Sequence, residues 1–404
     1  MNKVYVAFAC WCLTGCNPHP VVPFDEVVIG ERRDPVLHQR PKVDVLWVVD
    51  NSSSMEQEQA SLRDNFELFI DEMAAADADF HLAVVTTDMD PWDGETLAEN
   101  RGRFQNLPDG RPTSSGQGGA DVGHCPGELP LIIRSDAYRA QGVLDGDSLK
   151  RDFGCMATVG LRGSGFEQGL EAALTALSPA LATTHNAGFL RDDAHLAIVF
   201  VTDENDCSDR GAVERHNGNE CEYDADLLVP VDEYARAFRA LKPADKKVIV
   251  AGIFAPDTGA RAVRPNQIDK ACNAPTGVAY SGWRYDLLVQ AVGGITANIC
   301  DPPFTRALAE VAAVVGDALR ETCLSEVPAC QLDEDCVRIE LHRSPDAPPL
   351  EGARCEPARA GRDQVCILRA GEHYTIDYGA SCGVAVTMAV ETQEGDRVVA
   401  RYQR

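Results

Sequence analysis

The 404-residue sequence has few basic residues for its length. Its 37 lysines and arginines stand against 63 aspartates and glutamates, which gives a formal net charge of −26. A face that neutralises nucleic-acid phosphates needs clustered lysine and arginine, so this balance argues against nucleic acid as a partner. After the N-terminal segment no run of about twenty apolar residues occurs, so a later transmembrane helix is not expected.

Familiar catalytic and zinc motifs are also missing. The sequence contains neither an HExxH motif nor a GxxxxGK[ST] phosphate loop, and Gly163-Ser164-Gly165 lacks the spacing of a nucleophile elbow. No paired CxxC knuckles occur, which argues against structural zinc. We therefore expect a binding protein and not an enzyme, with a metal-assisted hydrolase as the remote alternative.

The N-terminus has the pattern of an export signal. Met1-Asn2-Lys3 is a short positive start, an apolar run follows from Val4 to Leu13, and the segment closes with Leu13-Thr14-Gly15-Cys16. This pattern predicts a secretory signal over residues 1–15. The same pattern also fits an ordinary cleaved signal followed by an accidental cysteine, or an uncleaved membrane anchor. Prolines and charges predict a tether over residues 16–41.

The end of this signal resembles a bacterial lipobox. That resemblance implies that Cys16 becomes the lipidated N-terminus and anchors the protein in the membrane of the cell envelope. The outer membrane is the expected location, on its periplasmic or its surface side.

Cysteine usage agrees with export. Of the 15 cysteines, Cys10, Cys12 and Cys16 lie in the signal and lipobox, and an even number follows. An even number in an oxidising compartment predicts disulfides. Proximity in the sequence suggests a disulfide between Cys207 and Cys221.

Apolar runs of strand length alternate with amphipathic helical patterns from Val43 onward. Strands are predicted at 43–49, 80–85, 196–201, 248–254 and 295–299, and helices around 62–73, 166–177, 234–241 and 308–319. Unbroken apolar strands are typical of a mostly parallel sheet covered by helices on both faces. We therefore predict a doubly wound α/β domain over 42–323.

Two regions depart from this rhythm. Residues 88–155 are rich in Gly, Pro, Asp and Ser and predict an insertion, either functional or mobile, which Cys125 and Cys155 could pin. Residues 324–404 are rich in cysteine and contain short strand-like segments, which predicts a small disulfide-stapled β module.

Polar oxygen donors follow two of the predicted strands. Asp50-Asn51-Ser52-Ser53-Ser54 comes directly after the first strand, and Asp203 ends the strand that includes Val201. Ligands of open α/β sheets bind beyond the carboxyl ends of the strands. One carboxylate and two hydroxyls on a single turn suit a hard cation such as Mg²⁺. Helix capping is the alternative role for these serines.

Two strand-end aspartates, one followed by x-Ser-x-Ser, resemble the metal-ion-dependent adhesion site of von Willebrand factor type A (VWA) domains. The resemblance implies a VWA or Rossmann-like fold in which Asp50, Ser52, Ser54 and Asp203 hold Mg²⁺, with Ca²⁺ or Mn²⁺ as alternatives. It also implies a coordination position left open for an acidic side chain of a protein partner.

A third loop of such sites usually supplies a threonine before a helix. Ser164 takes that place here, and Thr158 is the alternative. Glu167 could also approach the cation, although a solvated glutamate in a first helical turn is the simpler interpretation. The acidic segment from Asp203 to Asp209 is interpreted as a solvated loop.

Together these features imply a lipid-anchored binding protein of the cell envelope that serves adhesion or envelope assembly. The alternative is a structural envelope protein whose metal only stabilises the domain.

Overall fold

The computed structural model describes most of the chain after residue 40: residues 41–76, 78–89, 101–110, 122–127, 129–142, 147–214, 224–243, 246–259, 270–274, 277–301, 304–323, 337–347, 350–357, 364–377, 385–389 and 397–402. The predicted signal, the lipidation site Cys16 and the tether lie outside these residues, apart from Pro41. The chain divides into two compact units, one of Arg40–Thr322 and one that contains Cys323–Arg404.

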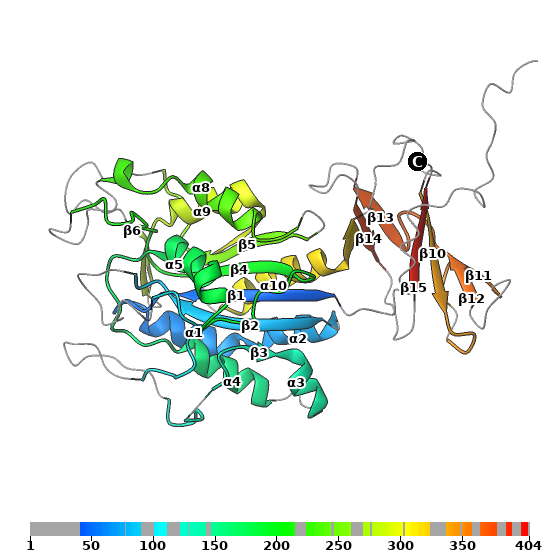
Figure 1. The fold of residues 1–404 in the computed structure, drawn as a ribbon, viewed down its shortest axis with the longest axis horizontal. Coiled ribbons are helices and arrows are strands. Elements are labelled where there is room, and N and C mark those ends of the chain that lie inside the picture. Colours follow the sequence, from blue (N-terminus) through cyan, green and yellow to red (C-terminus); the bar gives the residue numbers. More distant parts are fainter. Residues whose placement is uncertain are drawn as a thin grey trace, which may run out of the picture. The chain divides into compact units, whose positions relative to one another are not determined.

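The larger unit is built on a six-stranded sheet in the order β3-β2-β1-β4-β5-β8 (Figure 1). Its strands are β1 (Lys42–Val49), β2 (Asp79–Thr86), β3 (Ile133–Arg134), β4 (His195–Val201), β5 (Val248–Phe254) and β8 (Gly294–Asn298). All pairs are parallel except β2 with β3 at one edge. The predicted doubly wound, mostly parallel fold is therefore confirmed.

The strand order fixes where a ligand would bind. The chain builds outward from β1 through β2 to β3 and then returns to place β4 on the other side of β1. The direction of winding reverses between β1 and β4. Ligands of doubly wound sheets bind in the crevice at this switch point, beyond the carboxyl ends of the strands.

Helices cover both faces of the sheet (Figure 1). Trp47 of β1 belongs to one apolar core with α1 (Glu56–Asn65), α2 (Glu67–Ala75), α4 (Asp147–Ala157) and α10 (Thr305–Arg320). Leu46 and Val48 belong to the other core with α5 (Gly169–Ala176), α8 (Val231–Arg239) and α9 (Trp283–Val292). Successive side chains of a strand point to opposite faces, so burial on both faces requires the unbroken apolar runs of the sequence.

Residues 88–155 contain more regular structure than their composition indicates. The edge strand β3, helix α3 (Ser135–Ala140) and most of α4 lie in this region. Leu149 and Phe153 of α4 are buried in the core. The Cys125–Cys155 disulfide joins an irregular segment to α4, as the sequence suggested.

The remaining elements of this unit are short. They are α6 (Pro179–Ala182), a 3₁₀ turn (Ala225–Leu227), and the antiparallel pair β6 (Lys270–Ala274) and β7 (Gly277–Tyr280). A disulfide joins Cys272 of β6 to Cys300 after β8. Cys207 is also disulfide-bonded, whereas Cys221, its predicted partner, lies outside the described residues.

The smaller unit is all β in its described part. An antiparallel sheet has the order β11-β12-β10-β15. A second sheet has the order β13-β14-β9, in which β13 and β14 are antiparallel and β9 spans Glu321–Cys323. The strands are β10 (Val337–Arg343), β11 (Arg354–Pro357), β12 (Gln364–Ile367), β13 (Tyr374–Asp377), β14 (Ala385–Met388) and β15 (Arg397–Tyr402). The Cys355–Cys366 disulfide links β11 to β12. The prediction of a small disulfide-stapled β fold is confirmed.

Among the helices of the described residues, none combines the length and apolar character needed to cross a membrane.

Candidate metal centre

The two predicted strand-end motifs lie together at the carboxyl ends of β1 and β4. The backbone N–H of Asp50 donates to Val201 O at 3.0 Å, which continues the pairing of the two strands past their ends. The hydroxyl of Ser54 then donates to Asp203 Oδ1 at 3.2 Å. The hydroxyl oxygens of Ser52 and Ser54 are 3.1 Å apart. Four of the predicted ligands therefore form one chain of contacts.

Asp50 is fully buried, with 0% of its surface exposed. Its Oδ1 accepts the backbone N–H of Ser52 at 2.7 Å, and its Oδ2 accepts the hydroxyl of Thr202 at 2.6 Å. Helix α1 begins after Met55, and no side chain caps it by a hydrogen bond. The capping interpretation of the serines is therefore wrong for this helix.

The third loop reaches the same place through its backbone. The N–H of Gly163 donates to Asn51 O at 2.7 Å. A Cβ atom at Gly163 would lie 2.3 Å from Asn51 Oδ1, so any larger residue there would displace the Asn51 side chain. Ser164 is buried beside it, and its hydroxyl oxygen accepts the N–H of Phe166 at 3.0 Å. The structure thus brings the loop of Ser164 against the loop of Asp50.

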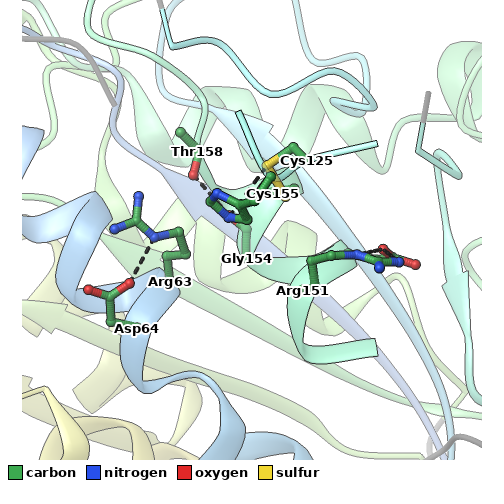
Figure 2. Close-up of a disulfide and its surroundings, with 9 residues drawn as sticks. Arg63, Asp64, Cys125, Arg151, Gly154, Cys155 and Thr158 are labelled. Carbon is green, nitrogen blue, oxygen red and sulfur yellow. Dashed lines mark hydrogen bonds and ion pairs between the residues drawn. A yellow bond between two sulfur atoms is a disulfide. The ribbon is translucent and has the colours of Figure 1, made fainter. Parts of the chain in front are cut away.

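Thr158, the alternative to Ser164, has a local role at the end of α4. Its hydroxyl donates to the carbonyl oxygen of Gly154 at 2.9 Å, next to the Cys125–Cys155 disulfide (Figure 2). This back-bond to the fourth residue before it is common for threonine at helix ends. The geometry favours Ser164 over Thr158 as the third-loop hydroxyl.

Glu167 does not behave as a solvated helical glutamate. Helix α5 begins at Gly169, so Glu167 precedes the helix, and 0% of its surface is exposed. Its carboxyl group faces that of Glu204, and this contact adds to the effect of burial in raising the pKa of Glu167. The solvated interpretation is therefore wrong, because the third loop turns this side chain inward.

The acidic segment after β4 is also buried, against expectation. Asp206 has no exposed surface; its carboxylate accepts the N–H of Leu170 at 3.0 Å and pairs with Arg284 Nε at 3.0 Å. Ser208 accepts the N–H of Glu171 at 3.0 Å. These side chains hold the first turns of α5 and α9 in place, so the segment supports the third loop.

The buried carboxylates shift each other's protonation. Burial raises the pKa of Asp50, and burial followed by repulsion from Asp50 and Glu204 raises the pKa of Asp203 well above its ordinary value. Burial, Glu204 and Asp50 raise the pKa of Glu167 in the same way. Burial also raises the pKa of Glu58 to about 7, with a contribution from Asp50.

Positive charge is what this cluster lacks. Within the described ranges, no lysine or arginine forms an ion pair with Asp50, Asp203, Glu58 or Glu167. Buried carboxylates are stable as anions only when a positive charge or hydrogen-bond donors compensate them. Carboxylate and hydroxyl oxygens are the donors that Mg²⁺, Ca²⁺ and Mn²⁺ prefer, so these residues fit a divalent cation.

A second group of metal-type side chains has another explanation. His124, Cys125 and Cys155 place potential ligand atoms within 4.8 Å of one another. The two sulfurs are bonded to each other, however, and metals bind the thiolate form of cysteine. This cluster is therefore a disulfide with a neighbouring histidine.

No protein-family model and no curated protein matches the sequence. Solved structures that the chain resembles include a von Willebrand factor type A protein from Catenulispora acidiphila, at 12% identity and a TM-score of 0.34, covering 90% of this chain and 63% of that one. They also include the pilus adhesin SpaC from Lactobacillus rhamnosus GG, at 10% identity and a TM-score of 0.37, covering 90% of this chain and 40% of that one.

A third such structure is the conserved hypothetical protein BatB from Bacteroides thetaiotaomicron, at 14% identity and a TM-score of 0.30, covering 69% of this chain and 98% of that one. The chain spans less than two thirds of the length of the first two proteins.

Proposed function

We propose that this chain binds a divalent cation, Mg²⁺ or alternatively Ca²⁺ or Mn²⁺, beyond the ends of β1 and β4. Asp50, Ser52, Ser54 and Asp203 would hold it, with Ser164 from the third loop. Through that cation the protein would bind a partner protein at the cell envelope, in adhesion or in envelope assembly. This is a binding function and not a catalytic one.

The observation that carries the proposal is the contact between Ser54 and Asp203. Residues 149 positions apart in the sequence bring a hydroxyl and a carboxylate within 3.2 Å at the switch point of the sheet. Buried polar oxygens normally satisfy one another or bind something. Here the neighbouring groups are carboxylates that repel one another, which is the environment that a bound cation stabilises.

The residues of the proposed site differ in exposure. Ser54 is exposed and Glu204 is half-buried, whereas Asp50 and Asp203 are buried beneath them. A partner's carboxylate could complete the coordination of the cation next to Ser54. The acidic surface of the chain would oppose an acidic partner only weakly, because charges beyond about 10 Å are screened at ordinary salt.

Metal binding can be tested by thermal unfolding of protein that begins after Cys16. At a Mg²⁺ concentration one hundred times Kd, mass action stabilises the native state by about 2.7 kcal/mol. We expect an increase in Tm with Mg²⁺ that EDTA reverses and that Asp50→Asn abolishes. Glu72→Gln, which neutralises an exposed carboxylate on α2, is the matched control and should keep the full response. A response that survives in Asp50→Asn would show that the site is misassigned.

A second candidate function follows from the burial of Asp50 and Asp203. A cation held beneath the surface could simply clamp the loops after β1 and β4, with partner binding elsewhere. The Ser52→Ala variant distinguishes the two functions. It should weaken metal-dependent capture of envelope proteins only if the cation contacts the partner. Capture that persists in this variant and in EDTA would favour the clamp.

A further inference from the structure

Helix α1 carries a buried side chain that contacts two loops of the proposed metal centre. Gln59 has 2% of its surface exposed, and its Nε2 donates to the carbonyl oxygens of Asp50 and Gly160, at 2.8 Å each. We propose that Gln59 is a positioning residue of the metal centre, which sets the distance between the loop of Asp50 and the third loop that carries Ser164. This inference rests on the proposed function and names a residue outside the ligand motifs.

Both carbonyl groups lie where regular backbone pairing has ended. Asp50 follows the last residue of β1, and Gly160 lies three residues after α4 ends at Ala157. Both residues are buried, and buried carbonyl oxygens outside helices and sheets need a donor from elsewhere. A primary amide offers two N–H donors on one nitrogen. Gln59 can therefore satisfy both carbonyls at once and hold them at one distance from each other.

The third loop is attached to the loop of Asp50 at a second point as well. The N–H of Gly163 donates to the carbonyl oxygen of Asn51, the residue after Asp50, at 2.7 Å. Two attachments, at Gly160 and at Gly163, fix the orientation of the segment between them, whereas one attachment would let it pivot. Ser164 follows this segment directly, so its place relative to Asp50 depends on both attachments.

Gln59 is itself held in place by the packing of α1. A Cβ atom at Gly154 of α4 would lie 2.9 Å from Cγ of Arg63, so the two helices touch there, and Figure 2 draws both residues at this contact. Arg63 lies about one turn after Gln59 on α1. Leu62 of the same helix is fully buried in the core. Because α1 is packed on the core and on α4, Gln59 is a fixed point to which the two loops are tied.

The chain offers a matched pair of variants. Gln59→Met removes both donors and keeps an unbranched side chain of similar helix propensity. Asn186 makes the same kind of contact elsewhere: it is 1% exposed, and its Nδ2 donates to the carbonyl oxygens of Gly102 and Ala176 at 2.8 Å each. Ala176 is the last residue of α5, whereas the third loop precedes the first. Asn186→Leu therefore removes two such bonds away from the proposed site.

Isothermal titration with Mg²⁺, Ca²⁺ and Mn²⁺ measures Kd for protein that begins after Cys16, at a temperature where every variant is folded. We expect Gln59→Met to raise Kd by roughly tenfold or more, since groups that orient metal ligands are worth about 10- to 100-fold. Asn186→Leu should keep the wild-type Kd. Both variants should lower Tm in EDTA, because each leaves two buried carbonyl oxygens without their donor. A lower Tm with an unchanged Kd in Gln59→Met would make Gln59 purely structural and overturn the inference.

A double-mutant cycle with Ser164→Ala tests whether Gln59 acts through the third loop. Changes that act on one structural unit are not additive, whereas independent changes add. We expect the effect of Gln59→Met on Kd to shrink in the Ser164→Ala background, because the hydroxyl that Gln59 positions is then gone. Effects on Kd that add in full would contradict positioning of Ser164.

The outcomes separate this inference from the proposed function. If the wild type binds none of the three ions, the proposed function fails and the inference fails with it. If the wild type binds an ion and Gln59→Met has the same Kd, only the inference fails. Should Gln59→Met not fold, NMR of the wild type decides: Mg²⁺ should shift the Nε2 proton signals of Gln59 and leave the Nδ2 proton signals of Asn186 in place. Unchanged Gln59 signals at saturating Mg²⁺ would overturn the inference.

Discussion

At the scale of single residues, Glu58 is not one of the predicted metal ligands, but its pKa depends in part on the charge of Asp50. It lies on α1 with only 4% of its surface exposed, and burial with a contribution from Asp50 raises its pKa from 4.5 to about 7. The carboxyl group therefore holds its proton more tightly in the folded chain than in the unfolded chain. Asp50, Asp203 and Glu167 are shifted in the same direction.

Stability of the metal-free protein should consequently fall as pH rises. A group whose folded pKa is raised contributes stability below its unfolded pKa, here 4.5, and loses that contribution as pH passes its folded pKa of about 7. We expect the Tm in EDTA to decrease between about pH 5 and pH 8, and Glu58→Gln to reduce that decrease. Saturating Mg²⁺ should flatten the dependence, because the cation favours the ionised carboxylates. Equal slopes for wild type and Glu58→Gln would contradict the assignment to Glu58.

At the scale of elements, β1 has an aspartate near each end with opposite surroundings. Asp50 at the carboxyl end lies among acids. Asp44 at the amino end is fully buried and accepts Lys242 Nζ at 3.0 Å and Arg191 Nε at 2.7 Å. The protein supplies its own cations at one end of the strand and, on our proposal, takes one from solution at the other.

Replacing Asp44 by asparagine should therefore affect stability and not metal binding. Breaking a buried ion pair from one side leaves an uncompensated charge and costs about 3–5 kcal/mol. We expect urea unfolding of Asp44→Asn to show a loss of that size, while its Kd for Mg²⁺ stays at the wild-type value. A loss of metal affinity in this variant would mean that β1 transmits strain between its ends.

At the scale of the whole molecule, the disulfides are consistent with folding in an oxidising compartment. Cys125–Cys155 and Cys272–Cys300 fasten irregular segments of the larger unit, and Cys355–Cys366 links two strands of the smaller one. Disulfides persist in oxidising compartments, which agrees with the export signal predicted at the N-terminus. That signal and Cys16 lie outside the described residues and stay predictions.

Lipidation can be tested on the full chain expressed in a bacterium with a lipoprotein pathway. Cys16→Ser should abolish incorporation of a labelled fatty acid and release the protein from membranes, because several acyl chains are needed for stable anchoring. Cys12→Ser, four residues earlier in the signal, is the control and should still be labelled. Labelling that persists in Cys16→Ser would rule out the lipoprotein assignment.

The sequence by itself determined the sheet and the position of the site on it. Apolar runs such as Val43–Val49 predict buried parallel strands, and the strand that ends at Val201 is predicted in the same way. Carboxyl ends of parallel strands share one edge, so the strand pattern alone places Asp50 and Asp203 at the same edge of the sheet. The observed strand order makes β1 and β4 neighbours there. The local sequence is sufficient to predict these strands, because burial on both faces of the sheet requires apolar residues along the whole strand.

Only the tertiary structure decided which loop side chains turn inward. Glu167 and Asp206 look like surface acids in the sequence, yet both are fully buried. Their burial depends on backbone hydrogen bonds that join segments distant in the chain: Cys207 donates to the carbonyl of Glu167, and Leu170 donates to the carboxylate of Asp206. The sequence likewise does not predict the helices within residues 88–155, because the glycine- and proline-rich stretch that precedes them masks their short apolar patterns. A polar side chain becomes buried when another segment of the chain folds over it. The residues next to it in the sequence do not show which segment that is.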